Sequence, residues 1–522
     1  MRAAEIIAAL SLATDVAIGV PVEHGLHSTL IAVRLARSLG VDAVTASEAY
    51  FGSLLFYVGC TATATVAEEI FADEGALTTY ATPVRFGPRR ERMSGMLRAI
   101  APPQDGLLTR AALVARSLPR LAREFSEVVA ANCEVAQILA DRLGLPAAFT
   151  SLFKDIGERW DGRGEPGHVK GDELSLSMRI VHVARDAAFQ SMLGGSAYAV
   201  QVVGERAGGA FDPVIAGRLA NAAAEILAFD SGASMWEETL ASEPAPNLML
   251  QGETIDRALA AIGDFGDLAS PYMTGHSAGV AALATGAAHH YGLQDSERVT
   301  IRRAALLHDV GRVAVPLGVW HKTSPLSQDD WEQIRLHAYQ SERILASSPF
   351  MAAIARVAGT HHERLDGSGY HRGTPAAGLS RTQRLLAAAD VCRALAEPRP
   401  HRAAFQSDQV AHALTEEVRT GHLDADAVAA VLEASGLPVP RLERPAGLTE
   451  REAEVIGLVA RGLQTKQIGR ALNISAKTAD RHVQNAYRKI GVSSRAGATL
   501  FAMQHGLVAW GELPISRPVR RP

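Results

Sequence analysis

The chain has 522 residues and a formal net charge of −4, and 47% of its residues are hydrophobic while only 5% are aromatic. This length predicts about three domains, and abundant alanine with few alternating Val/Ile/Thr runs favours an all-α protein. Three cysteines without a CxxC pair exclude a disulfide framework and argue against a thiolate zinc site, which fits a reducing cytoplasm.

An apolar stretch near the N-terminus runs from Ile6 to Val20 and is interrupted by Asp15. No convincing small-residue cleavage pattern follows it, so we expect a buried helix rather than a signal peptide. No other run reaches the ~18 uninterrupted apolar residues that a membrane span needs, so no membrane association is expected.

The first 430 residues contain a weak tandem repeat. A shift of 252 residues aligns His24 with His276, and a shift of 205 aligns residues 158–164 (ERWDGRG) with residues 363–369 (ERLDGSG). Chance similarity between alanine-rich helices is the alternative, but two gapless blocks in the same order favour a repeat. The two shifts differ, so the first copy carries an insertion between its two matched blocks.

Metal-ligand side chains concentrate in the second copy, within or beside helix-like runs. They are His276, His308, Asp309, His337, His361, His362 and Asp390. Imidazoles and carboxylates together suit Fe, Mn, Zn or similar ions, and the lack of thiolates argues against a closed structural zinc site. An isolated apolar-face histidine is more often structural than a ligand, so each of these residues taken singly leaves a structural role open.

The second copy resembles an HD-GYP domain of the HD superfamily. The resemblance rests on His276, residues 308–312 (HDVGR), His337, residues 361–373 (HHERLDGSGYHRG) and Asp390. It implies two divalent transition-metal ions, with Fe or Mn preferred. One ion would be held by His276, His308, Asp309 and Asp390, and Asp309 would bridge to a second ion held by His337, His361 and His362.

Such a pair of ions can clamp a phosphodiester and activate a water molecule. The resemblance therefore implies catalytic roles for Asp309 and Arg312, and substrate binding by Arg312, Asp366, Gly369 and Tyr370. Arg312 stands where the family has lysine and cannot readily give up a proton, so we expect slow hydrolysis. His371 replaces the proline of the GYP motif. Tyr272 replaces a glutamate that binds a third metal in some relatives, so two metals are expected.

The first copy keeps His24 but loses the other ligands. Phe56 and Tyr57 replace the His-Asp pair, and Arg185 aligns with Asp390. Residues 1–245 are therefore expected to form a degenerate HD-like domain without a metal site. Residues 246–432 are expected to form the HD-GYP-like phosphohydrolase domain.

Proline and glycine cluster between residues 436 and 447 and predict a linker over residues 433–446. Beyond it, residues 447–522 carry twelve Lys/Arg against five acids, a net charge of +7 that leaves −11 for the rest of the chain. A basic module on an acidic body predicts that this end binds a polyanion. We expect a domain over residues 447–510 and a basic tail over 511–522.

Helix signals in this module are strong. Thr449 and Glu452 form a capping box, and we expect a first helix that ends near Gly462. A short helix is expected from Thr465 to Leu472. After a turn, Ser475 caps a longer helix that spans 476–490 and ends at Gly491.

This module resembles the LuxR-type helix-turn-helix, through residues 448–452 (LTERE), 468–478 (IGRALNISAKT), His482-Val483 and 489–496 (KIGVSSRA). The resemblance implies binding of double-stranded DNA as a homodimer, with the exposed face of helix 476–490 in the major groove. Asp480 departs from the family because a cation usually stands there. The residues expected to contact DNA are Lys466, Lys477, Thr478, Arg481, His482, Gln484, Asn485, Arg488 and Lys489.

These features predict a one-component transcriptional regulator with a two-metal phosphodiesterase domain, whose substrate or ligand is a cyclic dinucleotide. Two alternatives stay open. The metal domain could bind a nucleotide without turnover in a ligand-gated transcription factor, or it could be a nucleotide phosphohydrolase of the wider HD class.

Overall fold

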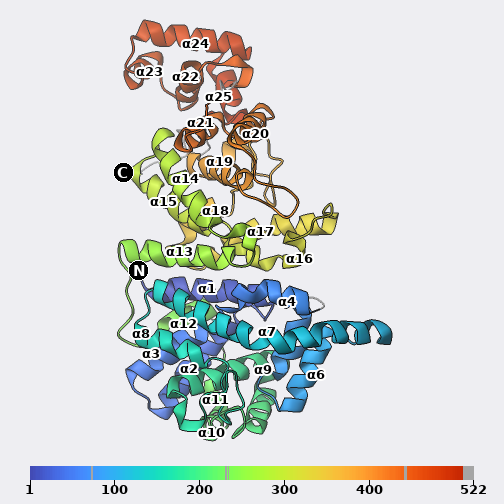
Figure 1. Ribbon diagram of the computed structural model, residues 1–522. Helices are drawn as coiled ribbons and strands as arrows, with labels where there is room; N and C mark the ends of the chain where they lie inside the picture. The colour runs from blue at the N-terminus through green and yellow to red at the C-terminus, as the bar shows by residue number, and fades with distance from the viewer. Residues whose placement is uncertain (72–73, 230–231, 233, 440–443, 509–522) are drawn as a thin grey trace. The chain divides into compact units, whose positions relative to one another are not determined.

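The computed structural model describes residues 1–71, 74–229, 232, 234–439 and 444–508 (Figure 1). These residues fold into helices and loops, and no strand forms among them, so the prediction of an all-α protein is confirmed. The expected basic tail over 511–522 lies outside the described residues. The chain divides into two compact units. Unit 1 holds Met1–Thr274, Asp309–Asp330 and Arg343–Ala352, and unit 2 holds the remaining residues.

The α-helices of unit 1 are α1 (Ala3–Ile18), α2 (His24–Leu39), α3 (Ala43–Leu54), α4 (Ala64–Ile70), α5 (Glu74–Ala76), α6 (Arg89–Ile100), α7 (Leu107–Arg142), α8 (Ala147–Thr150), α9 (Leu176–Glu205), α10 (Pro213–Asn221), α11 (Ala223–Ile226), α12 (Met235–Ala241), α13 (Glu253–Asp267) and α16 (Leu317–Trp320). Within unit 1, helices α1, α3, α9, α10, α11 and α12 pack against α2. Helix α1 is buried from Ala3 to Asp15 apart from the half-buried Glu5, so the predicted buried helix is confirmed.

Unit 2 contains the segments that carry the metal-ligand histidines. Its α-helices are α14 (His276–His290), α15 (Asp295–Leu307), α18 (Ala352–Ala358), α19 (Arg381–Leu395), α20 (Ser407–Arg419), α21 (Ala425–Ala434), α22 (Glu450–Ala460), α23 (Thr465–Ala471), α24 (Ala476–Ile490) and α25 (Arg495–Gln504), together with most of α17 (Gln328–Ala346). Helix α14 packs against α15, α19 and α21. This packing brings the first residue of α14 close to α19.

The helices of the C-terminal module form a small core of their own within unit 2. Helix α22 packs against α24 and α25, and α23 packs against α24. The predicted caps are present: Thr449 and Glu452 form the capping box, Ser475 caps α24, and Gly491 ends α24 in the left-handed region. Helix α25 was not predicted. Its buried Ala498 and Ala502 complete the core of the module.

Candidate metal centre and DNA-binding helix

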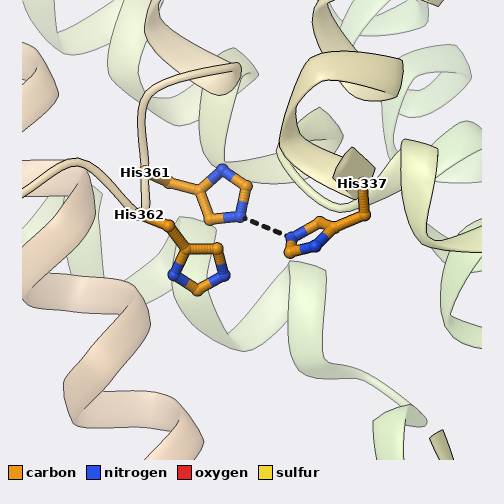
Figure 2. A group of neighbouring side chains, drawn as sticks. All are labelled: His337, His361 and His362. Atoms are coloured by element: carbon orange, nitrogen blue, oxygen red, sulfur yellow. Dashed lines mark hydrogen bonds between the residues drawn. The ribbon is translucent and has the colours of Figure 1, made fainter. Parts of the chain in front are cut away.

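Three histidines from two segments of unit 2 point toward one another (Figure 2). His337 lies on α17, and His361 and His362 lie in the turn after α18. Each offers a nitrogen such that the three atoms lie within 4.8 Å of one another, and Nε2 of His337 is 3.1 Å from Nε2 of His361. The side chains of His337 and His361 are buried, which keeps water from competing for the nitrogens.

The tautomers of His337 and His361 follow from their backbone contacts. Nδ1 of His337 is 2.5 Å from the carbonyl of Ile334, and Nδ1 of His361 is 2.6 Å from the carbonyl of Ala358. A carbonyl only accepts, so each Nδ1 carries the proton. In neutral rings the two Nε2 lone pairs then face each other. A divalent cation between them would satisfy both lone pairs, so this donor set fits a metal ion.

A second triad lies in the same unit and consists of His276, His308 and Asp390. Asp390 Oδ1 is 3.2 Å from Nε2 of His276 and 3.6 Å from Nε2 of His308. Burial alone would raise the pKa of Asp390, but the neighbouring imidazole rings of His276, His308 and His362 hold that pKa well below its ordinary value. The carboxylate therefore stays charged and able to bind a cation.

Asp390 also connects the two triads. Its Oδ2 is 3.7 Å from Nδ1 of His362, which belongs to the first triad. The structure thus brings together His276, His308, His337, His361, His362 and Asp390, which were singled out from the sequence as ligands.

Asp309 directly follows His308 and is the N-cap of the 3-10 helix η7 (Val310–Ala314), and Arg312 lies within this helix. Asp309 is buried, and its Oδ2 is 3.3 Å from Nη1 of Arg312. The guanidinium of Arg312 also stacks on Trp320, with Cζ 3.7 Å from the ring centroid. Arg312 thus contacts both a carboxylate and an aromatic ring. The contact with Trp320 was not predicted from the sequence.

The loop after His362 is shaped by close backbone packing. A Cβ at Gly369 would lie 2.6 Å from Cα of Glu363, so only glycine fits there. Tyr370 stacks on His362, with the ring centroids 4.3 Å apart. Asp366 lies on the exposed part of the loop, where its Oδ1 accepts the backbone N–H of Ser368. In this structure Asp366 therefore stabilises the turn of the loop that follows His362.

The corresponding loop of the first copy has the same geometry. A Cβ at Gly164 would lie 2.4 Å from Cα of Glu158. The carboxylates of Glu158 and Glu363 each accept two backbone N–H groups from the loop that follows. Sequence reasoning assigned Glu363 no role, although the repeat aligns it with Glu158. This shared geometry supports the interpretation of a tandem repeat.

In the first copy Arg185 is the residue that aligns with Asp390 in the sequence. Arg185 is 1% exposed and lies over the rings of Phe56 and Tyr57, with Cζ 4.6 and 4.3 Å from their centroids. Burial lowers the pKa of Arg185 to about 9. The backbone carbonyl of Arg185 accepts a hydrogen bond from Nε2 of His24 at 3.2 Å. A cation and a protonated Nε2 oppose metal binding here.

Helix α24 presents a polar face opposite its buried side. Ala479, Val483 and Ala486 are buried, whereas the helical spacing places Lys477, Arg481, Gln484 and Arg488 together on the opposite, exposed face. Thr478 and Lys466 are also exposed, and His482 and Asn485 are half-buried. Asp480 is exposed beside this face.

Lys489 differs from the other residues expected to contact DNA. Its ammonium group donates to Glu452 Oε2 at 2.6 Å and to the carbonyl of Gly447 at 2.9 Å. These contacts join the end of α24 to the start of α22, so Lys489 stabilises the module.

Two known protein families match successive regions of the chain. Residues 266–427 match the HD domain family, and residues 446–502 match the luxR family of bacterial regulatory proteins. The chain carries an HD domain followed by a LuxR-family helix-turn-helix domain. The HD domain contains both triads, and the LuxR-family domain contains α22 to α24.

The chain is homologous to HD-GYP cyclic dinucleotide phosphodiesterases. It is 28% identical over 441 residues to the 3'3'-cGAMP-specific phosphodiesterase 3 of Vibrio cholerae, and this alignment covers 83% of this chain and 94% of that relative. It is 34% identical over 160 residues to the cyclic di-GMP phosphodiesterase response regulator RpfG of Xanthomonas campestris, and this alignment covers 30% of this chain and 41% of that relative.

A crystal structure of a cyclic GMP-AMP specific phosphodiesterase of Vibrio cholerae has the same fold, with a TM-score of 0.58 at 24% identity over 84% of this chain and 98% of that one. Among the described residues, no helix has the length and hydropathy that crossing a membrane requires.

Proposed function

We propose that the HD domain hydrolyses a phosphodiester bond of a cyclic dinucleotide with two divalent metal ions, Fe or Mn, and that this activity is coupled to DNA binding by the LuxR-family domain. The observation that carries the proposal is the pair of ligand triads connected through Asp390. HD-domain phosphodiesterases are metal-dependent enzymes.

The ligand assignment follows the two triads. His276, His308 and Asp390 would hold one ion, and His337, His361 and His362 the other. Asp309 directly follows His308 and is proposed as the bridging ligand. Two ions bound there would polarise the phosphate and neutralise the charge of an in-line displacement.

The other residues of the site would bind and orient the substrate. Arg312 can bind a phosphate oxygen, but its guanidinium does not readily release a proton to the leaving oxygen. Tyr370 and Gly369 lie on the loop next to His362, where the tyrosine ring could stack on a base. We therefore propose slow turnover, because no lysine stands at position 312.

The relatives suggest which cyclic dinucleotide to test first. By their names, the Vibrio cholerae relative acts on 3'3'-cGAMP and the Xanthomonas campestris relative on cyclic di-GMP. The first of these aligns over 94% of its own length. 3'3'-cGAMP is therefore our first candidate, and cyclic di-GMP is the second.

Coupling to DNA binding is supported by contacts of helix α19 within unit 2. This helix carries Asp390 and, six residues earlier, Arg384. The buried guanidinium of Arg384 donates to the carbonyl of Gly506, just after α25, and to the carbonyl of Ala376 at 2.7 Å. A shift of α19 on metal or ligand binding would thus act on the LuxR-family domain, which we propose binds double-stranded DNA as a homodimer.

One observation favours a second candidate function. The guanidinium of Arg312 already contacts Asp309 and Trp320, so it has to leave these contacts to reach a substrate. If Arg312 keeps these contacts when a nucleotide binds, the HD domain would bind the nucleotide without turnover. It would then act as the sensor of a ligand-gated transcription factor.

An assay of the full-length protein distinguishes these functions. The protein is loaded with Mn²⁺ or Fe²⁺ and incubated with 3'3'-cGAMP, cyclic di-GMP and linear nucleotides. Slow conversion of a cyclic dinucleotide to a linear product, abolished by EDTA, is expected. Binding without product would favour the sensor, and cleavage of linear nucleotides alone would favour a nucleotide phosphohydrolase.

A further inference from the structure

Three of the metal-centre histidines are oriented by the backbone of their own segment. Nδ1 of His308 is 2.8 Å from the carbonyl of Ala305, and His337 and His361 make the same contact with the carbonyl three residues earlier, at 2.5 and 2.6 Å. In each case the preceding turn fixes the ring and directs Nε2 toward the centre.

His276 differs because it is the first residue of α14. Its N-cap, Gly275, has a φ of 76°, so the chain before His276 is not helical. Its Nδ1 instead lies 2.8 Å from Oε2 of Glu397, a residue 121 positions further along the chain. Nε2 of the same ring is 3.2 Å from Oδ1 of Asp390. The ring is therefore held between two carboxylates.

Glu397 is itself held in place. It is 8% exposed. Nε of Arg393 donates to its Oε1 at 2.6 Å, and Nη2 of Arg399 donates to its Oε2 at 3.2 Å. Two guanidinium groups thus compensate the burial of this carboxylate, which would otherwise be costly. Glu397 follows α19, the helix that carries Asp390, so one segment supplies both partners of the His276 ring.

The first copy provides an internal comparison. His24 also begins its helix after an N-cap with a φ of 72°, at Glu23. The shift that aligns Asp390 with Arg185 aligns Glu397 with Met192. Nδ1 of His24 is buried and has no hydrogen-bond partner in the described part of the chain. The copy that lost the metal ligands therefore also lacks the carboxylate behind its histidine.

From these contacts we infer that Glu397 is a positioning residue of the metal centre. Its carboxylate accepts the Nδ1 proton of His276, fixes the tautomer with a lone pair on Nε2, and directs that lone pair toward the site of His308 and Asp390. This inference rests on the proposed metal-dependent function. Loss of such an outer carboxylate typically weakens metal binding by about 10–100-fold.

The test measures Mn²⁺ binding to the full-length protein by equilibrium dialysis and metal analysis, without any substrate. Glu397→Ala should weaken one of the two Mn²⁺ sites by about 10–100-fold. Glu397→Gln keeps the side-chain volume and an acceptor oxygen, so its Mn²⁺ affinity should fall between those of Glu397→Ala and the unaltered protein. Thermal unfolding confirms that each variant is folded.

Glu433 provides the matched control, because its carboxylate also contacts a histidine Nδ1, that of His290, at 3.3 Å on an exposed surface of the same unit. Glu433→Ala should leave both Mn²⁺ sites unchanged. Unaltered Mn²⁺ affinity in folded Glu397→Ala would overturn the inference. If that variant does not fold, unaltered affinity in Glu397→Gln would overturn it. Failure of the unaltered protein to bind Mn²⁺ would instead refute the proposed function itself.

Discussion

At the scale of single residues, Arg312 is the side chain with the largest expected effect on the reaction rate. It contacts Asp309 and Trp320, and it stands where the family has a lysine. A lysine there could release a proton to the leaving oxygen, and general-acid catalysis contributes about 100-fold or more.

Arg312→Lys should therefore raise the rate of cyclic dinucleotide cleavage by about 10-fold or more. Steady-state kinetics with the Mn²⁺-loaded protein provide the measurement. Arg335→Lys, the same exchange on the exposed side of α17, is the control and should leave the rate unaltered. An equal rate for Arg312→Lys and the unaltered protein would show that position 312 does not limit catalysis.

Asp309 is the residue that would bridge the two ions. Asp309→Ala should lower the metal content of the purified protein from about two ions per chain to one or none, because both ions lose a ligand. Metal analysis after gel filtration measures this content. Asp329→Ala, an exposed carboxylate in the first turn of α17, should retain the full content. Two ions per chain in Asp309→Ala would refute its assignment as a ligand.

At the scale of elements, the exposed face of α24 should determine DNA affinity. Arg481→Ala should weaken operator binding by about 1–3 kcal/mol if Arg481 contacts a guanine, and it should relax sequence preference at one position. If Arg481 contacts phosphate alone, affinity should fall equally for all sequences, and the salt dependence should become shallower.

Fluorescence anisotropy with labelled DNA at several salt concentrations measures both effects. Arg419→Ala, on the exposed side of α20 in the HD domain, is the control and should bind DNA normally. Binding that is insensitive both to salt and to Arg481→Ala would contradict the assignment of α24 to the major groove.

Much of the local structure could be predicted because it depends on neighbouring residues. The capping box of Thr449, the cap at Ser475 and the end of α24 at Gly491 follow from side chains within a few positions of one another. The histidines proposed as ligands were singled out by their order along the chain, which resembles that of the HD-GYP family. Helix α25 was missed although Ser494 caps it in the same way as Ser475 caps α24.

The contact that orients His276 could not be predicted, because it joins distant segments. Glu397 lies 121 residues from His276, and no periodicity or motif connects the two. Arg185 was predicted to replace a ligand. The position of its guanidinium over Phe56 and Tyr57 could not be predicted. It depends on the packing of α9 against α3, which only the folded chain shows.

At the scale of the whole molecule, buried histidines of unit 1 should make the protein sensitive to acid. Burial lowers the pKa of His24 and of His182 from 6.5 to about 3. In the unfolded chain both take up a proton below about pH 6.5, whereas the folded protein does not. Their contribution to stability is therefore present above pH 6.5 and is lost as the pH falls toward 3.

Each of these histidines should reduce the free energy of unfolding by about 2 kcal/mol at pH 5 relative to pH 7. Melting temperatures measured between pH 7 and pH 4.5 should fall accordingly. His24→Gln removes one of the two groups and should flatten this decline, while His401→Gln, on an exposed loop, should not. Parallel curves for His24→Gln and the unaltered protein would contradict the prediction.

Coupling between the two domains can be tested through Arg384. Arg384→Met removes its hydrogen bond to the carbonyl of Gly506 and should abolish the difference in DNA affinity between the EDTA-treated and the Mn²⁺-loaded protein. Arg381→Met, three residues earlier on α19, is the control and should preserve the difference. An unaltered difference in Arg384→Met would place the coupling elsewhere.

The most direct test of the central claim is the cleavage of 3'3'-cGAMP by the Mn²⁺-loaded full-length protein, followed by chromatography of the products with the bound metal counted in the same sample. We expect about two ions per chain and slow formation of a linear dinucleotide that stops when EDTA is added. A protein with both ions bound that leaves every cyclic dinucleotide intact would contradict the proposed phosphodiesterase function.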